Sequence, residues 1–259
     1  MHIPFSKYQG TGNDFIIIDN RKKEYNFLRE EVARMCHRRF GIGADGLMLL
    51  EEEAGYDFKM VYFNSDGGES TMCGNGGRCL VKYASTKGIL KNTYRFLAID
   101  GAHEATIDLD GTVSLKMTDV GDVQRTGGHF ILNTGSPHWV EVVDDVQLVD
   151  VAVQGRERRH RPPYGAEGIN VNFVQLGAEP FRIKVRTYER GVEAETLSCG
   201  TGVTAAAIVC SHNENGFNRV EVDTPGGRLI VEYDKVNDAY KNVWLTGPAE
   251  EVFAGTISI

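Results

Sequence analysis

The chain has 259 residues, a length that predicts either one large domain or two domains of about 130 residues each. Its composition, 41% hydrophobic and 25% charged with 30 glycines, is that of a globular protein and excludes a disordered or fibrous chain. Lys and Arg total 28 and Asp and Glu total 36, so the net charge is −8. That sign disfavours a nucleic-acid-binding surface.

No segment has the composition of a leader or a membrane span. Residues 1–7 lack the apolar core of a signal peptide, and the densest apolar stretch, residues 203–210, is far shorter than the ~18 residues that a span needs. We therefore expect a soluble, cytoplasmic protein that binds neither membranes nor nucleic acid. The cysteines are odd in number and form no C-x-x-C pair, which disfavours a disulfide framework: Cys36, Cys73, Cys79, Cys199 and Cys210.

In the first half, a helical pattern over residues 30–40 leads into a glycine-rich turn, and a strand pattern over 47–50 follows. The turn, residues 41–46, fits G-x-G-x-x-G. In a dinucleotide-binding fold, however, that motif follows a strand and opens a helix. Because the order is inverted, these glycines are interpreted as a helix stop and a turn.

A second glycine-rich turn, residues 74–77, directly follows Cys73. It opens a helical pattern with an apolar face that ends near residues 87–88, and two alternating strands are expected over 105–109 and 112–117. Cys79 lies within this helix and is predicted to be a core residue, as are Cys36 and Cys210 in theirs.

The second half repeats the first at an offset of about 122 to 130 residues. Residues 11–13 correspond to 134–136, 43–47 to 165–169, and 58–73 to 184–199 without a gap, so that Cys73 aligns with Cys199. The second helix, over 203–210, is apolar almost all round, predicted to be fully buried, and expected to stop near 215–216. Strands are expected over 219–223, 228–233 and 242–245, and a solvated loop over 156–161.

The repeat predicts an α+β protein with two similar halves, residues 1–117 and 118–248, related by a pseudo-twofold axis. Each half is expected to be a curled, mostly antiparallel sheet or barrel around a central helix. Residues 249–259 lie beyond the second repeat and are expected to pack back on the first half.

The duplicated cysteines carry the chemistry in this interpretation. Each is followed by glycines that open a helix, whose free N–H groups and positive dipole end stabilise a thiolate and present donors to a carboxylate. If the two thiols face each other across a groove, one thiolate can remove a proton from a carbon while the opposite thiol delivers one. Two-base racemisation at the α-carbon of an amino acid uses both cysteines and needs no cofactor.

Two other interpretations stay open on the residues alone. The two cysteines can be buried thiols inherited from one ancestor, or they can serve a non-enzymatic redox or metal-binding protein. Two thiolates with His138 could ligate zinc, although no ligand cluster has metal spacing and no metal is expected.

Three long segments carry a family resemblance: residues 7–15 (KYQGTGNDF), residues 64–67 with 72–79 (NSDG and MCGNGGRC), and residues 189–191 with 195–202 (ERG and ETLSCGTG). They closely resemble diaminopimelate epimerases over the length of the chain. The resemblance implies a cofactor-independent enzyme, homodimeric in its relatives. Its reaction interconverts LL- and meso-2,6-diaminopimelate on the route to lysine and peptidoglycan.

By that resemblance Cys73 and Cys199 exchange the roles of base and acid. It implies that the amides of the two glycine turns hold the α-carboxylate, that His138 and Glu189 tune the cysteines, and that Asn13, Asn64, Asn170 and the Glu189–Arg190 pair bind substrate. The turn residues concerned are Gly74, Asn75, Gly200 and Thr201.

The sequence departs from the family pattern at three places. Gly46 stands where many members carry a glutamine that binds the distal end of the substrate, and Ser136 stands where asparagine is common. The loop 191–195 is one residue longer than in some relatives. A proline or hydroxyproline racemase keeps the paired thiols but changes the substrate; Asn75 and the Glu189–Arg190 pair argue against it, because an acyclic substrate with a second amino-acid head needs additional polar contacts.

Overall fold

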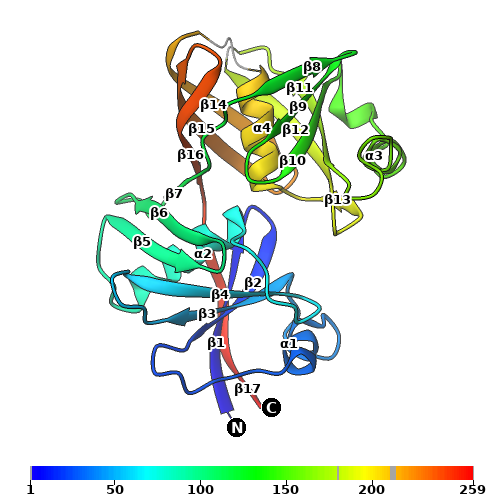
Figure 1. The fold of residues 1–259 in the computed structure, drawn as a ribbon. Coiled ribbons are helices and arrows are strands. Elements are labelled where there is room, and N and C mark those ends of the chain that lie inside the picture. The colour runs from blue at the N-terminus through cyan, green and yellow to red at the C-terminus, as the bar shows by residue number, and fades with distance from the viewer. Residues whose placement is uncertain (1, 180, 211–213, 259) are drawn as a thin grey trace. The chain divides into compact units, whose positions relative to one another are not determined.

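The computed structural model describes residues 2–179, 181–210 and 214–258. The chain forms two compact units: Met1–Leu115 together with Gly247–Ile259, and Lys116–Thr246 (Figure 1). The helices of the first unit are α1 (Arg29–Cys36) and α2 (Gly74–Thr86). Its strands are β1 (His2–Gly10), β2 (Asn13–Asp19), β3 (Gly46–Glu51), β4 (Phe58–Asn64), β5 (Thr93–Ala98), β6 (Gly101–Ile107), β7 (Val113–Lys116) and β17 (Glu250–Ser258).

The second unit contains helices α3 (Val151–Arg159) and α4 (Gly200–Cys210) and a short 3-10 helix, η1 (Val146–Leu148). Its strands are β8 (Val123–Thr126), β9 (His129–Asn133), β10 (Pro137–Val142), β11 (Asn170–Leu176), β12 (Arg182–Glu189), β13 (Ala194–Thr196), β14 (Gly216–Thr224), β15 (Gly227–Val236) and β16 (Ala239–Gly247).

The two units have the same succession of strand pairings. In the first, the strands lie in the order β17-β1-β2-β3-β4-β5-β6-β7, and only β2/β3 and β4/β5 are parallel. In the second, the order is β8-β9-β10-β11-β12-β14-β15-β16, and only β10/β11 and β12/β14 are parallel. The predicted mostly antiparallel α+β halves are therefore confirmed, with one correction: each sheet is curled and does not close into a barrel.

Helices cover both faces of the central strands, which explains why those strands are apolar throughout. In the first unit, Ile16 and Leu47 pack with Val32 of α1 on one face. On the other face, the first turn of α2 lies so close that a Cβ at Gly76 would come within 3.2 Å of the Met48 sulfur and 3.4 Å of the Phe15 ring. In the second unit α4 is buried along nearly all its described length, as its composition predicts.

Two sequence expectations are wrong in detail. The helix expected over 30–40 ends at Cys36 because the following turn folds back on it: the N–H groups of Gly41, Ile42 and Ala44 donate to carbonyls of His37, Met35 and Cys36.

The loop expected over 156–161 lies largely in helix α3. The Asp150 side chain accepts a hydrogen bond from Val153 N at 3.1 Å and caps this helix. Gly155 allows α3 to lie against β12, since a Cβ there would be 2.4 Å from the Cβ of Tyr188. The helix end expected near 215–216 is not seen in the described residues: α4 is described to Cys210, and residues 211–213 lie outside the described part.

Candidate active site

Each of the two duplicated cysteines directly precedes the central helix of its unit. Cys73 is the N-cap residue of α2, and its carbonyl accepts the N–H of Gly77 at 2.7 Å. Cys199 precedes α4, and its carbonyl accepts the N–H of Val203 at 2.8 Å. Since the first N–H groups of a helix have no acceptor within it, each thiol lies next to a set of donors and a positive dipole end. Cys73 is partly exposed and Cys199 is 7% exposed.

The first-unit site is formed where the β1–β2 turn meets the start of α2. The Cys73 thiol lies 3.5 Å from the Asn13 carbonyl oxygen Oδ1, and the Asn75 amide Nδ2 lies 3.5 Å from the same oxygen. The Thr11 hydroxyl is 3.4 Å from Asn75 Oδ1. Asn13, Cys73, Gly74 and Asn75, which the sequence assigns to substrate or chemistry, are therefore together.

A buried arginine that sequence reasoning missed fixes this turn. Arg78 is fully buried one turn into α2, and it donates to Asn75 Oδ1 at 2.9 Å and to the Gly74 carbonyl at 3.3 Å. Burial lowers the pKa of Arg78, while nearby thiols oppose that shift. A charged residue within an otherwise apolar helix segment was the available signal, because such a group is buried only with polar partners.

Asn64 is the last residue of β4 and lies opposite Gly46 in the β3/β4 ladder. Asn64 is exposed. The place that a side chain at position 46 would occupy is filled. A Cβ on Gly46 would be 2.5 Å from Cε2 and 3.0 Å from the hydroxyl of Tyr62, and 2.6 Å from the Phe63 carbonyl oxygen. The ring of Tyr62 and the Phe63 carbonyl therefore occupy the space into which a side chain at position 46 would extend.

In the second unit, Ser136 connects two of the expected substrate-binding residues. Its hydroxyl Oγ accepts from Asn170 Nδ2 at 2.9 Å and lies 3.3 Å from an Arg190 guanidinium nitrogen. The Asn170 carbonyl oxygen accepts the backbone N–H of Arg190 at 2.9 Å. Glu189 accepts from the Thr196 hydroxyl at 2.9 Å. The Cys199 sulfur lies 3.5 Å from the Thr201 hydroxyl.

His138 is fully buried and belongs to a polar network that sequence reasoning did not foresee. Asn172 donates from Nδ2 to the Trp139 carbonyl at 3.0 Å and lies 3.1 Å from His138 Nδ1, while its Oδ1 accepts from Thr187 at 2.9 Å. Because the Trp139 carbonyl only accepts, Asn172 must present its N–H groups, so His138 Nδ1 accepts and Nε2 carries the proton.

Burial and the positive charge of Arg190 lower the pKa of His138 to about 3, so its imidazole is neutral at physiological pH. Among the described residues, His138 Nε2 has no hydrogen-bond partner. In this tautomer Nε2 can only donate a hydrogen bond, and the ring has no lone pair left to accept a thiol proton.

The expected site residues thus form two groups, one in each unit. Within the described ranges, no group of three or more His, Cys, Asp and Glu side chains is arranged to hold a metal ion. Nor does any helix in those ranges combine the length and apolarity required to cross a bilayer.

Comparison with known proteins identifies the family. The sequence model described as diaminopimelate epimerase matches residues 5–124 and 130–252. The diaminopimelate epimerase of Flavobacterium psychrophilum is 50% identical over 255 residues, covering 97% of this chain and 98% of that protein. The one from Chlorobaculum tepidum is 42% identical over 261 residues, covering 96% and 99%.

Among solved structures, a phenazine biosynthesis protein of the PhzF family from Bacillus anthracis superposes with a TM-score of 0.78 at 14% identity, with full coverage of both chains, and so shares the fold. The full-length sequence matches show the relationship: the chain belongs to the diaminopimelate epimerase family.

Proposed function

We propose that the protein interconverts LL- and meso-2,6-diaminopimelate, using Cys73 and Cys199 as the two bases and no cofactor. The observation that carries this proposal is the equivalent placement of the two cysteines, each directly before the N-terminus of the central helix of its unit. Membership of the family supplies the substrate. The reaction belongs to the biosynthesis of lysine and peptidoglycan precursors.

In the proposed step, the thiolate of one cysteine takes the α-proton, and the C–H electron pair stays on the α-carbon. The thiol of the other cysteine then gives its proton to the opposite face of that carbon. The enzyme is left with the protonation states of its two sulfurs exchanged, and the reverse reaction starts from that state. The N–H groups at the two helix starts stabilise the carboxylate next to the developing carbanion.

The two groups of side chains around the cysteines are proposed to bind the charged ends of the substrate. Backbone amides at the helix starts are assigned to the α-carboxylate, and the remaining polar side chains to the ammonium and carboxylate groups. The residues in this assignment are Asn13, Asn64, Gly74, Asn75, Asn170, Glu189, Arg190, Gly200 and Thr201. His138 and Glu189 are assigned to tuning the thiols, with His138 acting as a donor.

The test is incubation with LL-diaminopimelate in deuterated water. A two-base reaction delivers a solvent-derived deuteron from one thiol while the other thiolate keeps the abstracted proton. Early meso product therefore carries deuterium at the inverted carbon, whereas unreacted LL isomer retains protium. Cys73→Ala and Cys199→Ala should abolish the exchange, and Cys210→Ala, a matched change of the thiol at the last described residue of α4, should leave it intact.

Two outcomes contradict the proposal. Wild-type protein that is reduced and free of metal but gives no exchange would rule out the epimerase activity. Activity on proline without activity on diaminopimelate would retain the cysteine pair but replace the substrate by that of a proline racemase.

We further propose that the enzyme is a cytoplasmic homodimer. Two working thiols require a reducing compartment. The nine-residue strand β17 is paired with β1 along one side only in the described ladders, and Val252 and Phe253 are 56% and 47% exposed. A long exposed edge strand presents unpaired backbone N–H and C=O groups that can pair with other chains, and a second copy of the protein would cover them. Val252→Lys should convert a dimer to a monomer in light scattering; a wild-type monomer would refute the dimer.

A further inference from the structure

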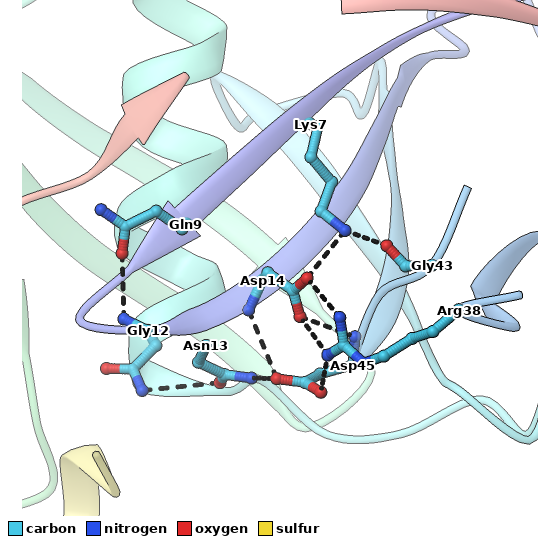
Figure 2. Close-up of polar contacts among 9 residues, drawn as sticks. Lys7, Gln9, Gly12, Asn13, Asp14, Arg38, Gly43 and Asp45 are labelled. Atoms are coloured by element: carbon cyan, nitrogen blue, oxygen red, sulfur yellow. Dashed lines mark hydrogen bonds and ion pairs between the residues drawn. The ribbon is translucent and has the colours of Figure 1, made fainter. Parts of the chain in front are cut away.

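The side chain of Asn13 has two ends that face different partners, and its NH₂ end points toward Asp45 (Figure 2). Its Nδ2 donates to Asp45 Oδ2 at 2.6 Å. Its Oδ1 lies 3.5 Å from the Cys73 thiol and 3.5 Å from Asn75 Nδ2. Asp45 precedes β3 and is far from Cys73 in sequence, so its position next to the cysteine's neighbour results from the fold.

The acid determines which way the amide points. A carboxylate paired with a guanidinium can only accept hydrogen bonds, so the group that faces Asp45 has to be the NH₂ of Asn13. The carbonyl oxygen is then directed to Cys73, where it can accept the S–H proton. A hydrogen bond that requires the proton on sulfur favours the thiol over the thiolate.

Asp45 is itself held in place by a compact ion network. One nitrogen of the Arg38 guanidinium lies 2.7 Å from both Asp45 Oδ1 and Asp14 Oδ1, and the other lies 2.9 Å from Asp14 Oδ2. The backbone N–H of Asp45 also donates to Asp14 Oδ1 at 3.1 Å. Asp14 contacts the buried Lys7 at 2.8 Å, and Lys7 also donates to the Gly43 carbonyl.

Within this network, the carboxylate of Asp14 stays charged over the physiological range. Burial alone would raise the pKa of Asp14, but the hydrogen bonds and charges of Arg38 and Lys7 lower it to about 2. Lys7 is 5% exposed and joins β1 to the turn before β3. The acceptor that faces Asn13 is therefore attached to three segments of the first unit rather than to a mobile loop.

We propose that Asp45 is a positioning residue that orients the Asn13 amide, so that the Asn13 carbonyl keeps Cys73 in its protonated, proton-donating form before substrate binds. The inference rests on the proposed function in assigning Cys73 to proton transfer. Beyond the proposed function, it specifies the protonation of the two cysteines before substrate binds: Cys73 is the one that carries its proton. At the other cysteine, the Thr201 hydroxyl lies 3.5 Å from the sulfur and, unlike a carbonyl, can donate to a thiolate.

The test measures the pH dependence of iodoacetamide alkylation at Cys73, resolved by peptide mass spectrometry. Only the thiolate reacts, so the rate reports its fraction at each pH. Asp45→Asn can accept as well as donate and permits the Asn13 amide to turn its NH₂ toward the sulfur. We expect the alkylation midpoint to fall by about one pH unit, which is about a tenfold faster reaction at pH 7.

A double-mutant cycle separates orientation from simple loss of a negative charge. If Asp45 acts through Asn13, then Asp45→Asn has no further effect in an Asn13→Ala background. If it acts through its charge alone, the same shift appears in both backgrounds, and the proposal is wrong. Asp19→Asn is the matched control. It breaks the ion pair between Asp19 and Arg21 at the end of β2 opposite to Asn13, and it should leave the pH profile of Cys73 alkylation unchanged.

Two further results are decisive. An unchanged midpoint in Asp45→Asn, or an equal shift in Asp19→Asn, overturns the proposal. If Asp45→Asn does not fold, Asp45→Ser removes the same carboxylate and is measured in its place, with folding checked by urea denaturation. Because alkylation needs no turnover, a protein that lacks epimerase activity still gives this readout, so the failure of the proposed function and the failure of this inference are distinguishable.

Discussion

The buried imidazole of His138 makes a quantitative prediction about stability and pH. Burial and the charge of Arg190 lower its pKa to about 3 in the folded protein, whereas a histidine in an unfolded chain titrates near 6.5. Below pH 6.5 the unfolded chain therefore binds a proton at this position that the folded protein does not take up until about pH 3. The stabilisation is present above pH 6.5 and is lost as the pH falls.

The magnitude follows from the two pKa values. Between pH 7 and pH 5 the free energy of unfolding should fall by about 2 kcal/mol on account of this one residue, because protonation of the unfolded state grows through the whole interval while the folded site stays neutral. The His138→Gln variant keeps an acceptor for Asn172 but has no titrating group here. Its free energy of unfolding should be lower than that of the wild type at pH 7 and should approach it at pH 5.

The assay is urea denaturation followed by tryptophan fluorescence. Both tryptophans, Trp139 and Trp244, lie in the unit that contains His138, so the signal reports its unfolding. Other groups that titrate between pH 7 and pH 5 cancel when the variant is subtracted from the wild type. Equal slopes for wild type and His138→Gln would refute a neutral buried imidazole.

Three other substitutions test the packing and contacts of the site. Gly202→Ala brings a Cβ to 2.2 Å from the carbonyl oxygen of a buried asparagine and should destabilise the second unit by about 1–3 kcal/mol; Gly121→Ala, with open space around it, should be neutral in the same thermal denaturation. Gly46→Gln should lower Tm and should not lower KM, because the Tyr62 ring fills the space that the new side chain needs. A variant with a lower KM or a higher activity would refute this reasoning. Ser136→Ala removes a hydroxyl shared by two proposed binding side chains and should raise KM about tenfold with a smaller change in kcat; an unchanged KM would remove it from the site.

The fold could be predicted to a large extent because the duplication is visible in the sequence. Three ordered correspondences predicted two similar halves, and both units show one succession of ladders. Helix α3 was missed because its surface is polar and it buries only Val151 and Gly155. It is held by tertiary contacts, including an Arg158–Glu141 ion pair at 2.6 Å, which no local pattern displays.

The two cysteines stand out by their position in the repeat, and the residues around them were expected from the family resemblance, but the contacts that support these residues were not predicted. Asp45 stands in a glycine-rich turn, where an aspartate is expected for backbone reasons alone, and its partner Arg38 fell within a supposed helix. Asn172 gave a weak signal: it shares one face of a mostly apolar strand with Asn170, and a polar group on a buried strand needs partners. Those partners come from β10 and β12, which only the folded chain brings together.

Duplication made the two cysteines equivalent, and later divergence of their neighbours made them chemically different. Asn75 follows Cys73 by two residues, and Thr201 follows Cys199 by the same number. Asn13 and Ser136 also correspond in the repeat, yet Asn13 directs a carbonyl to the Cys73 sulfur, whereas Ser136 is engaged with Asn170. The proposed two-base inversion requires one sulfur protonated and the other not when the substrate arrives. A symmetric pair would have no structural preference between the two states, and these substitutions in the repeat supply one.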